Sequence, residues 1–216
     1  MTLDSSFAIQ MRQIVKEIIQ SPELHAKWLN TLSFLENCGA RKIAACQHPT
    51  LVKEEMLKHA AEEFRHSHYL KRQIERVSSE TIVDYSLPYL LGGFSTLNYL
   101  NFLDIQASRY LKEVGYSNAS IKEIAYLLVT YAIELRAGEL YPIYDEILRK
   151  NGSKVTVKSI LLEEKEHLAE MKVGIAKLPS GYMHASYVCS IESHLCQNWL
   201  EAVAQNIRAI RCAHCS

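Results

Sequence analysis

The sequence predicts an all-α protein: a four-helix bundle with one additional apolar helix inserted between its halves and one extra helix after it. Two observations support this fold class. Apolar residues recur at helical spacing through most of the chain, and the alternating patterns typical of strands are nearly absent. Prolines and glycines interrupt the helical pattern at only a few points, which divide the chain into long helical segments.

These interruptions set the expected helix boundaries. Pro22 opens the first helix, and Pro49 opens the second after a break, because proline fits the first turn of a helix. Pro142 should bend the longest helix, and Gly152 and Gly181 lie in turns that separate helices. The expected helices cover about 22–46, 49–77, 95–114, 119–150 and 155–178, with a last one that ends near 210.

Length and composition limit the classes of protein. A chain of 216 residues supports one domain, 1–216, with the bundle core at about 29–178, the extra C-terminal helix at 179–210 and a tail at 211–216. The 24 basic and 24 acidic residues balance, so we expect no nucleic-acid partner. No apolar run is long enough to insert into a membrane and residues 1–20 lack a signal-peptide pattern, which together indicate a cytoplasmic protein.

The six cysteines show no disulfide framework typical of a small secreted protein, so reduced thiols are expected. Cys212 and Cys215 form a Cys-x-x-Cys pair near the C-terminus. A structural zinc site would need two more ligands from elsewhere in the chain. We therefore favour a tail without function over a metal or redox role for this pair.

An internal repeat of titratable residues is the strongest functional signal. Each half of the predicted bundle is a helical hairpin with a glutamate on its first helix and a Glu-x-x-His motif on its second. The six residues are Glu36, Glu63, His66, Glu134, Glu164 and His167. On a helix, residues three positions apart share a face, so each motif presents a carboxylate and an imidazole on the same side.

The neighbours of these glutamates at helical spacing are mostly apolar, which predicts that all four carboxylates face the core. A buried, unpaired carboxylate costs several kcal/mol, and no lysine or arginine lies on these stripes to compensate it. Two divalent metal ions would provide the compensation. Oxygen-rich ligands with one imidazole per metal favour iron or manganese over zinc. The alternative is that rim glutamates and satisfied core histidines produce the pattern.

Small residues follow each single glutamate by about one turn: Gly39 with Ala40, and Ala137 with Gly138. A glycine inside a helix costs about 0.5–1 kcal/mol relative to alanine, so both glycines require a reason. Close approach of helices, or room for dioxygen and a substrate beside the metals, would be one.

At these motifs the chain resembles the ferritin-like di-iron carboxylate superfamily, which includes bacterioferritins, rubrerythrins, ribonucleotide reductase small subunits, demethoxyubiquinone hydroxylases and aldehyde-deformylating oxygenases. The resemblance implies a ferritin-like four-helix bundle in which Glu63 and Glu164 bridge two metals. It also implies one metal bound by Glu36, Glu63 and His66 and another bound by Glu134, Glu164 and His167.

Departures from the family pattern favour an oxidase or oxygenase over a storage ferritin. Storage ferritins typically carry one Glu-x-x-His motif, whereas this chain has two, and the apolar crossover segment 87–114 separates its two hairpins. The chain has no four-cysteine rubredoxin module, which argues against a rubrerythrin-like peroxidase. The crossover segment either covers the core, which we favour, or walls a channel for an apolar substrate.

The resulting functional prediction is an oxidoreductase with two Fe ions, or a Mn/Fe pair, that activates O2 to oxidise a small apolar organic substrate. Its expected partners are this substrate, O2, an external electron donor and, in a homodimer, a second copy of the chain. Tyr131 and Tyr141 flank Glu134 and could donate protons or an electron, although plain packing is favoured for both. The alternatives are a ferroxidase or iron-handling protein of the bacterioferritin type and a metal-free helical interaction module.

Overall fold

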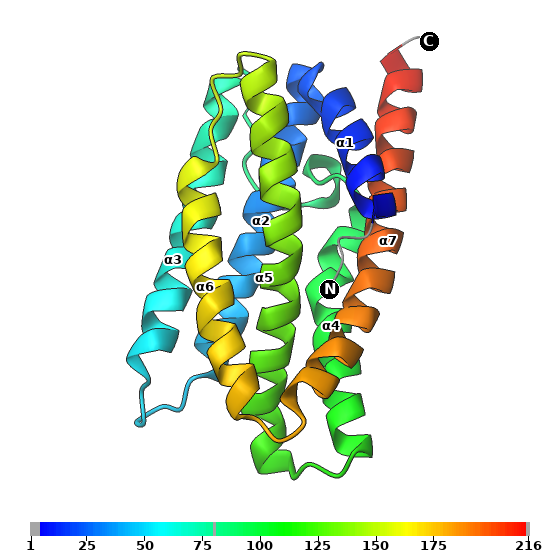
Figure 1. Cartoon of the computed structure of the whole chain (residues 1–216). Helices are drawn as coiled ribbons and strands as arrows, with labels where there is room; N and C mark the ends of the chain where they lie inside the picture. The colour runs from blue at the N-terminus through cyan, green and yellow to red at the C-terminus, as the bar shows by residue number, and fades with distance from the viewer. Residues whose placement is uncertain (1–4, 80, 215–216) are drawn as a thin grey trace.

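The computed structural model describes residues 5–79 and 81–214, and within them every regular element is a helix (Figure 1). The all-α prediction is thereby confirmed. Two short 3-10 helices, η1 (Ile74–Arg76) and η2 (Leu87–Tyr89), flank the crossover between α3 and α4. The α-helices are α1 (Ser5–Ile19), α2 (Pro22–Cys46), α3 (Glu54–Gln73), α4 (Gly93–Glu113), α5 (Asn118–Lys150), α6 (Lys158–Lys177) and α7 (Gly181–His214).

The helices pack as hairpins that lie side by side. α2 packs against α3, and α5 packs against α6, so these four helices lie together in Figure 1. α4 packs against α7 and α5 on one flank. α1, the first helix of the chain, packs against α5. α4 and α7 therefore lie beside the four helices that carry the six candidate ligands.

Local sequence signals explain several helix ends. The side chain of Ser21 caps α2 by accepting a hydrogen bond from the backbone N–H of Leu24, and Pro22 occupies the first turn. Ser117 caps α5 in the same way through the N–H of Ser120. α5 continues through Pro142, which lies on the exposed side of the helix.

The prediction omits one helix and misplaces two helix boundaries. Residues Ser5–Ile19 form a helix that the predicted elements omit, although the spacing of Phe7, Met11 and Ile18 carries the signal and all three are buried. α3 begins at Glu54 rather than at Pro49, because the His48 side chain accepts hydrogen bonds from following backbone N–H groups and holds the segment in a turn. α7 continues to His214, past the expected end near 210.

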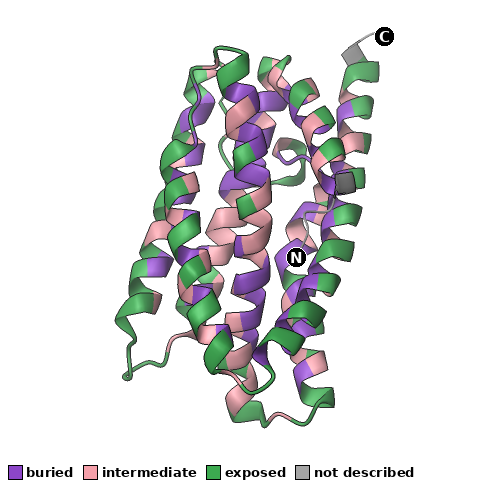
Figure 2. Ribbon diagram, viewed as in Figure 1, coloured by how far each residue is buried: buried purple, intermediate pink, exposed green. Residues whose placement is uncertain are grey.

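Two apolar clusters form the core, and the helices present buried inner faces and exposed outer faces (Figure 2). The larger cluster joins α1, α2, α5 and α7 around Trp28, Tyr144 and Trp199. The smaller one lies between α4, α5 and α7 around Leu103 and Leu128. The core therefore connects the flanking pair α4 and α7 to the helices that carry the candidate ligands.

No helix in the described part of the chain is long and apolar enough to span a membrane. Four of the cysteines are thiols within or beside the helices, namely Cys38, Cys46, Cys189 and Cys196. Cys212 is exposed near the end of α7, and Cys215 lies outside the described residues.

Candidate metal centre

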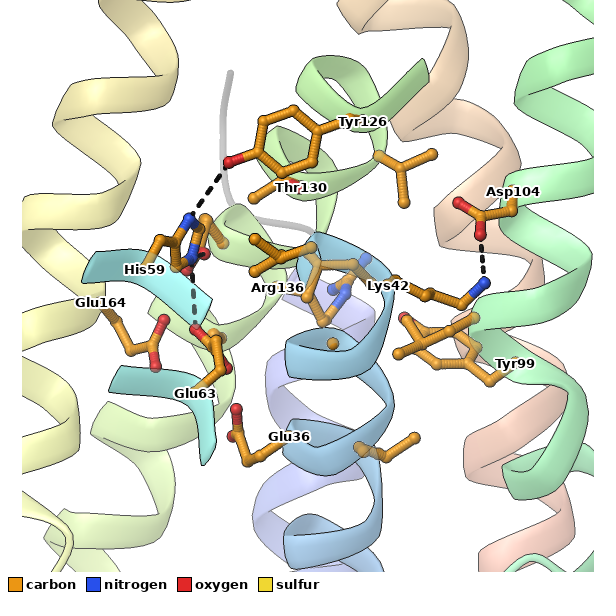
Figure 3. A pocket seen from close by; sticks show the side chains of 18 of the residues that line it. Glu36, Lys42, His59, Glu63, Tyr99, Asp104, Tyr126, Thr130, Arg136 and Glu164 are labelled. Carbon is orange, nitrogen blue, oxygen red and sulfur yellow. Dashed lines mark hydrogen bonds and ion pairs between the residues drawn. The ribbon is translucent and has the colours of Figure 1, made fainter. Parts of the chain in front are cut away.

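All six residues of the repeat come together between α2, α3, α5 and α6. Each of the four helices contributes one glutamate, and α3 and α6 each add a histidine one turn later. Five of the six side chains are buried, and three of these five are glutamates, which are charged in water. Glu36 is half-buried, and Figure 3 shows it on the same side of the cavity as Glu63 and Glu164.

The ligand atoms form two overlapping groups, in each of which they lie within 4.8 Å of one another. Glu63 belongs to both groups, so its two oxygens can serve both. Either group contains the number of donors that a metal ion needs from a protein. The first group is Glu36, Glu63, His66 and Glu164, and the second is His59, Glu63, Glu134 and His167.

The structure adds His59, which the sequence prediction missed. Its Nε2 lies 3.0 Å from an oxygen of Glu134 and 3.3 Å from one of Glu63. His59 precedes Glu63 by four residues and His66 by seven, so helical spacing places it on the same buried face and could have identified it. Glu164 joins Glu36, Glu63 and His66, as a bridging residue would, but the second group contains His59 and not Glu164, so only Glu63 belongs to both.

Two carboxylates outside the cluster orient its histidines. Nε2 of His66 donates to Glu163 at 2.7 Å, and Nε2 of His167 donates to Glu62 at 2.8 Å. Glu163 is itself held by two hydrogen bonds from Arg65. Both histidines therefore turn Nδ1 toward the cluster, the arrangement by which carboxylates fix the orientation of metal-binding histidines.

Buried polar atoms without hydrogen bonds test whether the residues fit a metal ion. Among the described residues, four such atoms belong to the cluster: Nδ1 of His66, Nδ1 of His167, Oε2 of Glu134 and Oε1 of Glu164. His66 Nδ1 and Glu164 Oε1 lie only 3.1 Å apart, yet neither is in a hydrogen bond of good geometry. Buried polar atoms are rarely left in this state. Imidazole nitrogen and carboxylate oxygen are donors that metal ions accept, so the residues fit one.

The same crowding perturbs protonation. Burial, followed by the charges of Glu63 and Glu164, raises the pKa of Glu36 well above its usual range. Burial and the charge of Glu164 raise the pKa of Glu134 in the same way. For His167, burial lowers the pKa, but hydrogen bonds and charge from Glu164 outweigh it and raise the pKa to about 9. Metal binding at this cluster must therefore displace protons.

A cavity of about 320 Å³ adjoins the cluster. Carboxylates of the cluster line one end, and mostly apolar side chains of α2, α4 and α5 form the walls. On the opposite side, Lys42 of α2 and Asp104 of α4 form an ion pair across the gap between their helices (Figure 3). The crossover segment thus supplies cavity wall through Tyr99, Leu100 and Asp104, as well as covering the core.

The two predicted tyrosines lie in different places. Tyr141 lines the cavity, and its hydroxyl donates to Glu36. Tyr131 is not among the cavity-lining residues and packs in the smaller apolar cluster, near Cys189. Tyr126, which the sequence prediction did not include, lines the cavity with its hydroxyl 3.5 Å from Nδ1 of His59.

The glycines beside the single glutamates also differ. Gly39 lines the cavity, and a Cβ atom there would lie 3.8 Å from Oε2 of Glu63. The absence of a side chain at Gly39 therefore leaves space next to the cluster, which is one of the reasons that the sequence analysis suggested for both glycines. A Cβ atom at Gly138 would have nothing within 4 Å, and no contact in the structure explains that glycine.

No protein-family model, curated protein or solved structure matches this chain. The resemblance to the ferritin-like superfamily therefore rests on the ligand motifs and on the order of the helices that carry them. The function has to be inferred from the chemistry of the cluster and the cavity.

Proposed function

We propose that the chain is a ferritin-like oxidoreductase that uses two iron ions, or a manganese and an iron ion, to activate O2 for the oxidation of a small apolar organic molecule. The single observation that supports this most is the juxtaposition of two overlapping ligand groups with an apolar cavity. In this proposal α2, α3, α5 and α6 form the ferritin-like four-helix bundle.

The donor set favours iron and manganese. The first group offers three carboxylates and one imidazole, and the second offers two of each. The first set is oxygen-rich and suits these metals better than zinc, and Glu63, which both sets share, would be the residue common to the two ions. When bound, two such ions supply a position for O2 and electrons for its reduction.

The residues of the chain would supply positioning and exclusion of water. Glu62 and Glu163 hold the histidines with Nδ1 inward, and Tyr141 holds one oxygen of Glu36 through its hydroxyl. The apolar walls keep bulk water from the reacting atoms. An external electron donor would restore the metals after each turnover.

The cavity limits the substrate. Its volume of about 320 Å³ is at the lower end of the range for ligand pockets, about 300–1,000 Å³. Its walls include Leu32, Leu100 and Ile133, which favour hydrocarbon or aromatic groups over sugars or nucleotides. The substrate would therefore be small and largely apolar.

One observation weighs against each of the two alternatives. A ferroxidase must admit hydrated iron ions, for which polar walls are better suited. A metal-free interaction module gives no reason for four buried donor atoms without hydrogen bonds at one place.

Metal analysis tests the proposal. Protein produced with iron and manganese should contain about two metal ions per chain, as the ligand count requires. Glu63→Ala should remove most of both, because Glu63 belongs to both groups, whereas Glu166→Ala on the exposed side of α6 should keep them. A wild-type protein without iron or manganese, or a Glu63→Ala variant that retains both ions, would refute the assignment.

Oxygen consumption separates oxidase from ferroxidase. With the ferrous protein and a chemical reductant, O2 uptake that rises on addition of small hydrocarbons or aromatics supports the proposal. Uptake that depends only on added ferrous iron, together with a cage-sized assembly by light scattering, would favour iron storage and contradict it.

A further inference from the structure

Four aromatic rings form a continuous row from the cavity into the core. Tyr99 stacks on Trp199 with ring centroids 5.8 Å apart, and Trp199 stacks on Trp28 at the same distance. Trp28 meets Tyr144 edge-on at 6.3 Å. All three contacts lie within the range of direct ring interaction. The row draws on α4, α7, α2 and α5, so it exists only in the folded protein.

The two ends of the row lie in different surroundings. Tyr99 and Trp199 line the same cavity as the carboxylates of the candidate metal centre. Figure 3 shows Tyr99 in the cavity wall, beside the Lys42–Asp104 pair. Trp28 and Tyr144 are fully buried in the larger apolar cluster. Beyond Tyr144 lies His25, also buried, with Nε2 2.7 Å from the tyrosine hydroxyl. The row thus connects the cavity with a tyrosine–histidine pair in the core.

The proton acceptors along the row decide where an oxidised ring is stabilised, because a phenol loses its proton when it loses an electron. The indole N–H of Trp199 donates to the hydroxyl of Thr96, and the indole N–H of Trp28 has no hydrogen-bond partner among the described residues. Neither is a base. An oxidised tryptophan here would have no group to take its proton and would draw an electron from a neighbouring ring.

The two tyrosines differ in the base beside them. Tyr99 donates to Glu192, a carboxylate that Arg136 holds through two N–H groups at 2.8 and 2.7 Å. Glu192 therefore already accepts two hydrogen bonds from a guanidinium besides that of Tyr99, whereas, in the described part of the chain, His25 Nε2 faces the Tyr144 hydroxyl alone. Burial lowers the pKa of His25 to about 4, so its imidazole is neutral at pH 7 and can accept a proton. An oxidised phenol is acidic enough to protonate it.

We propose that this row transfers single oxidising equivalents from the cavity to Tyr144, where they are held as a tyrosyl radical beside His25. In the step, a one-electron oxidant formed from O2 in the cavity gains one electron, and Tyr144 loses one through Trp28, Trp199 and Tyr99. The phenolic proton of Tyr144 moves to Nε2 of His25. The products are a neutral tyrosyl radical and an imidazolium, and an added electron returns both to their starting state.

The source of the oxidant rests on the proposed function, but the row itself does not. In the absence of substrate, Tyr144 would give the metal centre a place to discharge an oxidising equivalent that would otherwise react with the cavity wall. The cavity wall includes the thiol of Cys46, a group that oxidants can attack.

Flash photolysis of the metal-free protein tests the row directly. A laser pulse can ionise tryptophan, and the chain has only two tryptophans, both in the row. The absorbance of the tryptophan radical should decay as that of a tyrosyl radical rises, and the conversion should slow in heavy water. Tyr144→Phe should lose most of the tyrosyl signal and prolong the tryptophan radical, while Tyr131→Phe, at another buried tyrosine, should not.

Helicity by circular dichroism first establishes that each variant is folded. An unchanged tyrosyl yield in folded Tyr144→Phe, or loss of the signal in Tyr99→Phe instead, overturns the proposal. A second variant, His25→Gln, should slow tyrosyl formation several-fold and abolish the heavy-water effect. An undiminished rate in that variant likewise overturns the role of His25.

Electron paramagnetic resonance of the iron-loaded protein tests the link to O2. Exposure to O2 without substrate should give a tyrosyl radical that narrows on ring deuteration of tyrosine and is missing in Tyr144→Phe. O2 consumption without this radical overturns the proposed transfer. Absence of O2 consumption overturns the proposed function instead, while a positive flash experiment still supports the row.

Discussion

Replacing Glu134 by glutamine should stabilise the metal-free protein and weaken its stabilisation by metal. Glu134 is only 3% exposed, and its Oε2 has no hydrogen-bond partner among the described residues. Glutamine keeps the oxygen that accepts from His59 and places an amide N–H next to the Glu164 carboxylate. The substitution therefore removes a crowded acidic group and adds a donor.

The magnitude follows from the cost of the buried carboxylate. A buried charge without a partner costs several kcal/mol, and a hydrogen bond to a charged group contributes about 1.5–3 kcal/mol. We expect Glu134→Gln to gain about 1–3 kcal/mol without metal, or roughly 2–12 °C in Tm for a chain of this length. The pKa of Glu134 is raised, so the folded wild type loses stability as pH rises and the gain should increase with pH.

Metal should reverse the order of the two proteins. At a free metal concentration about 1,000 times the dissociation constant, the wild type gains about 4.1 kcal/mol per site, whereas the variant lacks a ligand of the second group and gains little there. Calorimetric melting with a chelator and then with manganese measures both effects, and Glu166→Gln on the exposed side of α6 is the control. A variant that is destabilised without metal, or that gains as much stability from metal as the wild type does, refutes the reasoning.

Three further predictions concern orientation, protonation and packing. Glu163→Gln should weaken metal affinity about 10- to 100-fold, measured by competition with a chromogenic chelator, because His66 loses its carboxylate partner; equal affinity would contradict this. Burial lowers the pKa of His25 from 6.5 to about 4, so the unfolded chain binds a proton at a higher pH than the folded chain does. Between pH 6.5 and 4 the free energy of unfolding of the wild type should therefore fall by up to about 3 kcal/mol relative to that of His25→Gln, as measured by urea unfolding. Parallel curves for the two proteins would exclude the effect. Gly181→Ala should destabilise by about 1–3 kcal/mol, because its Cβ would lie 2.0 Å from the carbonyl oxygen of Ile175. Gly138→Ala, whose Cβ would have no atom within 4 Å, should raise the free energy of unfolding by about 0.5–1 kcal/mol. If the two substitutions changed stability in the same direction, the local geometry would not explain their effects.

The sequence predicted the cluster because its members share helix faces. Glu63 and His66 are one turn apart, and the spacing of Glu164 and His167 is the same, so periodicity alone places each pair together. His59 obeys the same rule but lies outside the Glu-x-x-His motif. Glu62 was not predictable in this way, because its partner His167 lies 105 residues away and only the packing of α6 against α3 joins them.

The fold was predictable where side chains mark helix ends, and less so elsewhere. Pro22 and Ser117 mark helix starts that the structure retains. Pro49 misled, because the hydrogen bonds that His48 accepts stabilise a turn and depend on a ring orientation that no local propensity encodes. Tyr131 was placed near the site by its distance from Glu134 in sequence, but its ring packs in the smaller apolar cluster, near Cys189 of α7.

The crossed carboxylate–histidine pairs have a consequence for how the protein folds. Glu62 on α3 orients His167 on α6, and Glu163 on α6 orients His66 on α3, so each hairpin holds the other's histidine. Neither hairpin alone can present a complete set of oriented ligands. Metal uptake should therefore follow the docking of the two hairpins rather than guide it, and the kinetics of metal binding would report on the last stage of assembly.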